Sequence, residues 1–376
     1  MTPRDAYIAL NMMDGMGPVR VRNLIAAVGS AEAIFEADEA ALLTAEGVGR
    51  EMAKRIMEQR GTVDPAGEED KARRHHARIV SFVDEDYPKP LRNIYDPPLA
   101  LYVRGTLEKR DRHSVAVVGT RTPTHYGSSV TDRLSYQLAK AGFTVISGLA
   151  RGVDTAAHKA ALKGDGRTIA VLGSAIDKLY PAENAELADR IAEHGAVISE
   201  YTMGRPSDRT TFPYRNRIVS GMSMGLLVVE ASKESGAMIT ADMAAEQGKT
   251  IFAVPGRIDQ PSSRGTHHLI KEGARLVEDV DDILQEFDAL LPTEQKKSAK
   301  QNTKRPDVPL SEPEQAIVKA LWKGNLDVDE LTREAALPSA KVSAMLMGLE
   351  MKRVVRILPG RIVELVKELR DSRFET

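Results

Sequence analysis

The sequence predicts an α/β protein built around a doubly wound, mainly parallel sheet, with a small helical domain before the sheet and a winged helix after it. Short apolar runs alternate with helical patterns through the centre of the chain, which is typical of a parallel sheet with helices on both faces. The run at 115–118 is apolar at every position, which indicates a strand buried on both faces. The expected strands of this kind lie at 115–119, 143–146, 168–172, 196–198, 225–229 and 250–254.

The first 65 residues contain a repeated pattern of helix, Gly-apolar-Gly turn and helix. Gly15 and Gly17 flank the first turn, and Gly47 and Gly49 flank the second. The repeat resembles the helix-hairpin-helix motif, in which N–H groups of the turn and of the next helix start bind a DNA phosphate. Two interpretations stay open: these turns bind phosphate, or they only pack the helices of a domain spanning 1–65.

The central domain is expected to span 72–291. A polar joint at 61–71 connects it to the helical domain, and two further short apolar runs, 77–83 and 99–103, add strands at its beginning. Because the carboxyl ends of parallel strands meet at one edge of a sheet, we expect the loops that follow the strands to form the ligand site.

The first of these loops carries the residue types of an anion site. Gly119, Thr120 and Arg121 follow the strand at 115–119, and a helical pattern begins a few residues later. Free N–H groups at a helix start, the helix dipole and a planar guanidinium all favour a phosphate. The sequence therefore predicts a phosphate site after this strand.

A second loop repeats this pattern after the next strand. It contains Gly148, Arg151 and Gly152, and an alanine-rich helix follows. Asp154 lies at the start of that helix, where a carboxylate is typical of an N-cap. Both loops are expected to lie at the same edge of the sheet.

A third cluster combines basic, amide and aromatic side chains. Its members are Arg209, Phe212, Tyr214, Arg215, Asn216 and Arg217. Aromatic faces can stack bases while arginine and asparagine hold the backbone, a combination typical of proteins that bind single strands. The alternative is a solvated helix start whose two aromatic residues anchor it to the core.

After the sheet the composition changes. The segment 292–310 is rich in lysine and nearly free of apolar residues, which indicates a basic flexible linker. Helical patterns at 312–321, 328–335 and 339–351 and a hairpin at 354–358 and 361–365 predict a winged helix within 311–370. The early part of the third helix offers Ser339, Lys341 and Ser343, too few groups for base readout. We therefore favour a protein-contact or backbone-level role for this domain.

Composition excludes several classes of protein. The chain has 376 residues, no cysteine and a net charge of −2, so it is neither a disulfide scaffold nor a general polycation. Residues 1–11 lack a signal-peptide pattern, and no apolar run reaches the length of a membrane span, so no membrane contact is expected. We also expect no cofactor and no metal site, because no Gly-x-Gly-x-x-Gly follows a strand and the histidine pairs lack companion ligands.

Several longer motifs resemble the DprA/Smf family of DNA-processing proteins. They are Gly119-Thr-Arg121, Ser147-Gly-Leu-Ala-Arg151-Gly-Val-Asp154, Phe212-Pro-Tyr-Arg215-Asn-Arg217, Ser235-Gly-Ala-Met-Ile239 and Val254-Pro-Gly256. The resemblance covers about residues 80–290 closely. It implies an extended Rossmann-like fold and a cytoplasmic, non-enzymatic protein that binds single-stranded DNA without sequence preference. It further implies protection of incoming DNA in natural transformation, loading of the RecA recombinase, and a homodimer formed through the Rossmann-like domain.

The resemblance also implies roles for particular residues. Gly119, Thr120 and Arg121 correspond to the family's phosphate loop, although the family often has serine where this chain has Thr120. The remaining residues that it assigns to the pocket are Gly148, Arg151, Gly152, Asp154, Phe212, Arg215, Asn216 and Arg217. By this resemblance Arg121 and Arg215 or Arg217 neutralise phosphates, Phe212 stacks a base, and Asp154 caps its helix or orients Arg151.

Two alternatives from other classes remain. Related Rossmann-like enzymes hydrolyse nucleoside monophosphates with a Pro-Gly-Gly-x-Gly-Thr loop, but residues 236–240 read Gly-Ala-Met-Ile-Thr. The other alternative is a scaffold that binds partner proteins through the winged helix and DNA only weakly.

Overall fold

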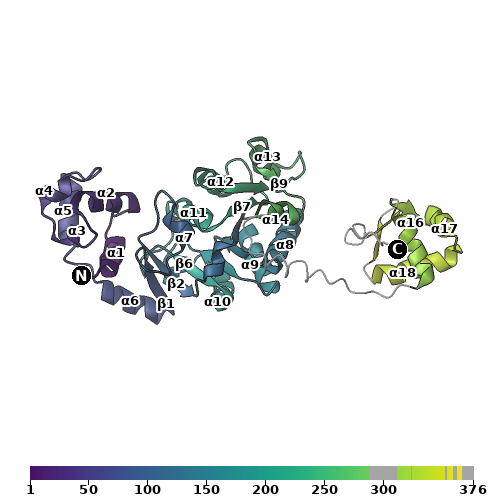
Figure 1. Cartoon of the computed structure of the whole chain (residues 1–376), viewed down its shortest axis with the longest axis horizontal. Coiled ribbons are helices and arrows are strands. Elements are labelled where there is room, and N and C mark those ends of the chain that lie inside the picture. The colour runs from purple at the N-terminus through teal and green to yellow at the C-terminus, as the bar shows by residue number, and fades with distance from the viewer. Residues whose placement is uncertain (288–310, 323, 352–353, 359–361, 366–376) are drawn as a thin grey trace. The chain divides into compact units, whose positions relative to one another are not determined.

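The computed structural model describes residues 1–287, 311–322, 324–351, 354–358 and 362–365 (Figure 1). The chain forms two compact units, Met1–Gln301 and Asn302–Thr376. The predicted linker at 292–310 lies outside the described residues. In the described part of the chain, no helix combines the length and the apolar character needed to cross a bilayer.

A nine-stranded sheet forms the centre of the first unit, in the order β1-β2-β6-β5-β4-β3-β7-β8-β9. Strands β3 to β9 run parallel, whereas β1 and β2 are antiparallel to their neighbours. The strands are β1 (Ala77–Ser81), β2 (Ala100–Gly105), β3 (Ser114–Val118), β4 (Thr144–Ser147), β5 (Thr168–Val171), β6 (Ala196–Ser199), β7 (Gly225–Val228), β8 (Thr250–Ala253) and β9 (Arg275–Leu276). The predicted doubly wound, mainly parallel sheet is confirmed.

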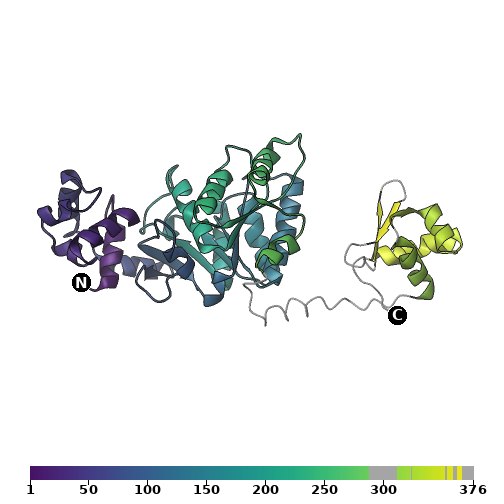
Figure 2. The ribbon, with the colours of Figure 1, turned by 45° about the horizontal axis from the view of Figure 1, so that its top comes forward.

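Helices cover both faces of this sheet because the strands are apolar on both sides (Figures 1 and 2). Val115 and Val117 of β3 pack against one helical layer, and Ala116 and Val118 pack against the other. The first layer contains α8 (His125–Lys140), α9 (Val153–Lys163), α10 (Ala185–His194) and α14 (Asp281–Phe287). The second contains α7 (Lys89–Arg92), α11 (Thr211–Met222), α12 (Gly236–Glu246) and α13 (Arg264–Lys271).

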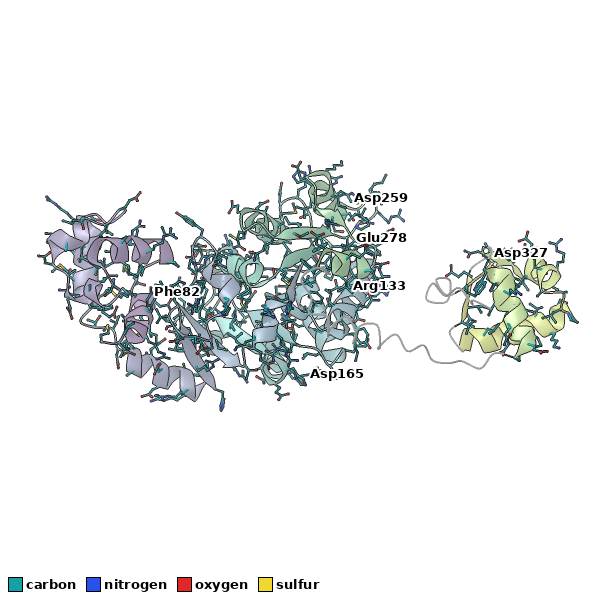
Figure 3. All side chains as sticks on the ribbon, viewed as in Figure 1. Phe82, Arg133, Asp165, Asp259, Glu278 and Asp327 are labelled. Carbon is teal, nitrogen blue, oxygen red and sulfur yellow. The ribbon has the colours of Figure 1, made fainter. Side chains whose placement is uncertain are left out.

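Six helices precede β1, and the first and last of them pack on the β1 edge of the sheet. The six are α1 (Pro3–Met12), α2 (Pro18–Val28), α3 (Ala33–Glu36), α4 (Glu39–Leu43), α5 (Arg50–Gln59) and α6 (Pro65–Arg74). Tyr7 of α1 stacks on Phe82 with ring centroids 5.6 Å apart, and Figure 3 labels Phe82 at this junction. Asn11 donates a hydrogen bond to the Glu200 carbonyl at 3.1 Å. The helical segment is therefore continuous with the sheet in one compact unit.

The prediction of a polar joint at 61–71 is wrong, because 65–74 forms helix α6. Its carboxylate Glu68 is buried and accepts hydrogen bonds from the Tyr102 hydroxyl at 2.9 Å and the Met203 N–H at 2.7 Å. A polar sequence can therefore form a packed helix when its buried charge has internal donors.

The second unit has the predicted winged-helix elements. These are α16 (Glu312–Leu321), α17 (Val328–Glu334), α18 (Ser339–Met351), β11 (Val355–Leu358) and β12 (Ile362–Leu365). A short strand that the sequence pattern did not predict, β10 (Leu326–Asp327), pairs with β12. Ile317, Leu331, Leu349 and Val363 meet in its core. The predicted turn at 359–360 lies outside the described residues.

A buried ion pair fixes α11 against the sheet. Arg217 is 3% exposed and donates to both Glu200 oxygens, at 2.8 and 2.5 Å, just after β6. Its Nε lies 2.9 Å from the Asp96 carboxylate, and its guanidinium lies 3.9 Å from the centroid of the Tyr214 ring. One side chain thus joins α11, the end of β6 and the segment before β2.

We expect Glu200→Ala to lower the free energy of unfolding by about 3 kcal/mol, because it leaves a buried guanidinium without its main partner. Urea unfolding of the full chain, followed by circular dichroism, measures this loss. Asp70→Ala removes one partner of the exposed Arg73–Asp70 pair and should leave stability nearly unchanged. Equal stability of the two variants would contradict the role assigned to Glu200.

Candidate nucleic-acid interface

The loop after β3 lies where the winding of the sheet reverses. Strand β3 pairs with β4 on one side and with β7 on the other. The Thr120 N–H donates to the Glu230 carbonyl at 2.7 Å, which ties this loop to the end of β7. In doubly wound sheets, such a reversal leaves a crevice at the carboxyl ends of the strands.

Gly152 allows the first two loops to touch. Its φ is +76°, and a Cβ there would lie 2.4 Å from the Thr120 carbonyl oxygen. The next residue, Val153, donates its N–H to that same oxygen at 3.2 Å. Only glycine fits this close approach without displacing the Thr120 loop.

The structure brings four predicted residues together around one small pocket, namely Arg121, Gly148, Arg151 and Phe212. The Arg121 guanidinium lies 5.5 Å from the centroid of the Phe212 ring. Tyr180 packs against the same ring with centroids 5.7 Å apart. The pocket therefore combines two cations with two aromatic rings.

The two exposed arginines of the pocket differ in their surroundings. Arg121 makes no ion pair among the residues that the structure describes. Arg151 donates from Nε and Nη2 to the two carboxylate oxygens of Glu183, both at 2.7 Å. The hydrogen bond from Arg151 lowers the pKa of Glu183, so this carboxylate stays charged to a lower pH than an ordinary glutamate.

Asp154 has a different role from the two that the sequence predicted. The N-cap of α9 is Gly152, and Asp154 lies inside the helix. Its buried carboxylate accepts the N–H groups of Gly148 at 3.1 Å and Ala150 at 3.3 Å, and Arg151 turns to Glu183 instead. Burial raises the pKa of Asp154, and Arg215 opposes that rise. Asp154 orders the pocket loop from beneath.

Arg215 and Arg217 are buried, so neither is placed to contact a DNA strand. The predicted role of these two arginines in neutralising phosphates is therefore corrected. Arg215 is 4% exposed and donates to the carbonyl oxygens of Gly148, at 2.7 Å, and Val171. Arg217 is held by Glu200 as described. Asn216 is half-buried, and its Oδ1 accepts the Arg215 Nε–H at 3.2 Å. These three residues build the wall that carries Phe212.

Sequence reasoning missed Tyr180 and Glu183. Both follow β5, whose carboxyl end lies at the same edge as the two recognised loops. Tyr180 is 44% exposed, more than the half-buried Phe212. The only sequence signal for these two residues was their position after the predicted strand β5. The segment between β5 and Tyr180 carries no phosphate-binding pattern.

The glycine turns of the N-terminal helices have the predicted geometry at their helix starts. Gly17 and Gly49 are the N-caps of α2 and α5, and neither helix has a side-chain cap. Gly15 and Gly47 have φ values of +80° and +76°, which favour glycine. Phosphate binding at these turns stays a prediction.

Comparison with known families matches all three parts of the chain. The family model for DNA recombination-mediator protein A matches residues 78–288, more than half of the 376 residues. The chain belongs to the DNA recombination-mediator protein A (DprA) family. The DprA winged-helix model matches 301–361, and a SAM-like helix-hairpin-helix tandem matches 7–61. The predicted family resemblance is confirmed.

Two similar proteins support the assignment. Protein Smf from Synechocystis is 34% identical and aligns with 94% of this chain and 96% of its own length. DNA processing protein DprA from Bacillus subtilis is 40% identical over 55% of this chain and 70% of its own length.

Two solved structures share the fold. DNA processing protein A from Streptococcus pneumoniae superimposes with a TM-score of 0.68 at 34% identity, covering 76% of this chain and 98% of that chain. DNA processing protein A from Helicobacter pylori, described for its single-stranded DNA binding mode, gives a TM-score of 0.52 at 30% identity, covering 58% of this chain and 99% of that chain.

A fully buried histidine of α9 lies against the start of β5. His158 of α9 is 0% exposed, and its Nδ1 lies 2.6 Å from the Thr168 Oγ1. Burial, with a smaller contribution from the nearby Arg215 charge, lowers the pKa of His158 to about 3. His158 is therefore neutral in the folded protein at physiological pH.

Acid should destabilise the first unit through His158. Its pKa in the unfolded chain is about 6.5, so the unfolded state binds a proton first as the pH falls. The free energy of unfolding should therefore drop by about 2 kcal/mol at pH 5. Urea unfolding at pH 7.5 and pH 5.0 measures this change. His158→Gln should remove it, and an equal acid response in the variant and the wild type would refute it.

Proposed function

We propose that this chain binds single-stranded DNA, without reading its sequence, through the pocket between Arg121 and Arg151. The observation that carries the proposal is the placement of Arg121 over the Phe212 ring, beside the exposed ring of Tyr180. A cationic groove with aromatic platforms is the common solution for binding single strands. Guanidinium groups suit phosphates, and every base offers a face for stacking.

The roles of the pocket residues follow from how exposed each side chain is. Arg121 is exposed and takes a backbone phosphate. Phe212 is half-buried, so it supports both Arg121 and Tyr180 and offers only part of its own ring to a base. Tyr180 offers the more exposed ring. None of these contacts distinguishes one base from another.

We further propose that the bound strand is protected and then delivered to the RecA recombinase, as in natural transformation, and that the protein acts as a homodimer formed through the Rossmann-like domain. The family assignment supports this setting. RecA filament growth on a strand coated with single-strand-binding protein, with and without this chain, tests delivery. Light scattering of the purified chain tests the dimer.

Arg121→Ala should weaken binding to a labelled single strand about tenfold, because one charge-assisted phosphate contact is lost. The loss should be equal for different base sequences, and the plot of log affinity against log salt should become shallower by about 0.7. Fluorescence anisotropy at several salt concentrations measures both.

Arg110→Ala is the matched control for this measurement. Arg110 is exposed but precedes β3, at the opposite end of that strand from the pocket. It should leave binding unchanged. Equal binding by wild type and Arg121→Ala would exclude the pocket as the site that binds single-stranded DNA.

Tyr180→Leu should weaken binding about fivefold to tenfold, because it keeps apolar bulk but removes a face worth about 1 kcal/mol or more per stacked base. Strands with abasic positions separate stacking from backbone contact. Wild type should lose affinity for the abasic strand, whereas Tyr180→Leu should bind normal and abasic strands more equally. The same abasic loss in both proteins would rule out stacking on Tyr180.

A further inference from the structure

The Arg151 guanidinium is occupied by a carboxylate at the mouth of the pocket. Its Nε and Nη2 each donate to one oxygen of Glu183 at 2.7 Å. This two-pronged geometry is the one that a guanidinium also presents to two oxygens of a phosphate. A phosphate group can therefore bind this Nε–Nη2 edge of Arg151 only when Glu183 leaves it.

Solvent exposure makes that exchange feasible. The Arg151 and Glu183 side chains are 56% and 54% exposed. An ion pair so open to water is weak, and salt screens it further. By contrast, the equally bidentate Arg217–Glu200 pair is 3% and 7% exposed, where no competing anion can approach.

Glu183 is not needed to hold its own segment in place. The neighbouring Asn184 anchors this segment, since its Nδ2 donates to the Leu149 carbonyl and to the Thr155 Oγ1, both at 2.9 Å. Asn184 is buried, whereas Glu183 reaches outward from the same short 3-10 turn. The carboxylate can therefore release Arg151 without releasing the segment.

We propose that Glu183 is a displaceable phosphate mimic that limits the affinity of the pocket and speeds release of the strand. The proposal rests on the proposed function. A strand first engages Arg121, which has no competing carboxylate among the described residues, and the adjacent phosphate then replaces Glu183 on Arg151. During dissociation Glu183 recaptures Arg151, so the guanidinium never loses all its partners at once.

The size of the effect follows from the strength of the pair. The apparent affinity is reduced by the fraction of molecules in which Arg151 is free. For an exposed pair this corresponds to a factor of about two to five at low salt. Glu183→Gln should therefore raise single-strand affinity about two- to fivefold, chiefly through slower dissociation, and the gain should shrink at high salt.

Anisotropy and stopped-flow dissociation of a labelled oligothymidylate, with the full chain, test the proposal. Four variants are compared with wild type: Glu183→Gln, Arg151→Ala, the double variant and Asp189→Asn. Asp189 is an equally exposed carboxylate, at 56%, paired with Arg104. Arg104 lies beside Val197 near the start of β6, so this pair is at the opposite edge of the sheet from the pocket. Its removal controls for net charge.

The expected result is a gain in affinity for Glu183→Gln that disappears when Arg151 is also removed, with no gain for Asp189→Asn. An equal gain with Arg151 absent, or an equal gain for Asp189→Asn, would reduce the effect to general repulsion and overturn the proposal. If binding depends on Arg121 but Glu183→Gln leaves the affinity unchanged or lowers it, the role proposed for Glu183 is overturned and the proposed function stands. No strand binding by any of the proteins would overturn both.

Discussion

The geometry of the pocket depends on how the crossover helix α11 is held against the carboxyl edge of the sheet. Two buried guanidinium groups do this. Arg217 bonds to Glu200 at the end of β6, and Arg215 bonds to carbonyl oxygens at the ends of β4 and β5. Their burial is costly unless every donor finds an acceptor, so the backbone around them has little freedom. Phe212, one helical turn before, is placed by the same constraint.

Close contacts between the backbone and these buried side chains also fix the position of the exposed residues. A Cβ on Gly148 would lie 2.5 Å from the Arg215 guanidinium, and a Cβ on Gly173 would lie 2.7 Å from the Phe212 ring. Together with Gly152, these glycines let three loops and a helix start meet with no side chain between them. The result is a rigid floor on which only a few side chains face solvent. A chain with a net charge of −2 thus carries a local cationic site.

The sequence allowed the sheet, its winding and two of the pocket loops to be predicted, because apolar runs followed by glycine and arginine have a direct structural meaning. It could not separate the arginines by exposure. Arg121, Arg215 and Arg217 are chemically identical in a motif, yet only Arg121 faces solvent. Burial of an arginine depends on acceptors such as Glu200 that lie elsewhere in the chain, so local spacing carries no signal for it. The same limit hid Glu68 in α6 and the contact between Arg151 and Glu183.

Two arginine–glutamate pairs show how burial alone decides what one interaction does. Both are bidentate, with donor–acceptor distances between 2.5 and 2.8 Å. In the core, loss of either partner leaves an unsolvated charge, so the Arg217–Glu200 pair acts as a permanent structural joint. At the pocket mouth, water solvates whichever group is released, so the Arg151–Glu183 pair competes on nearly equal terms with any incoming oxyanion. In the release that we propose, Arg151 exchanges its phosphate for Glu183, whereas Arg121 releases its phosphate into water.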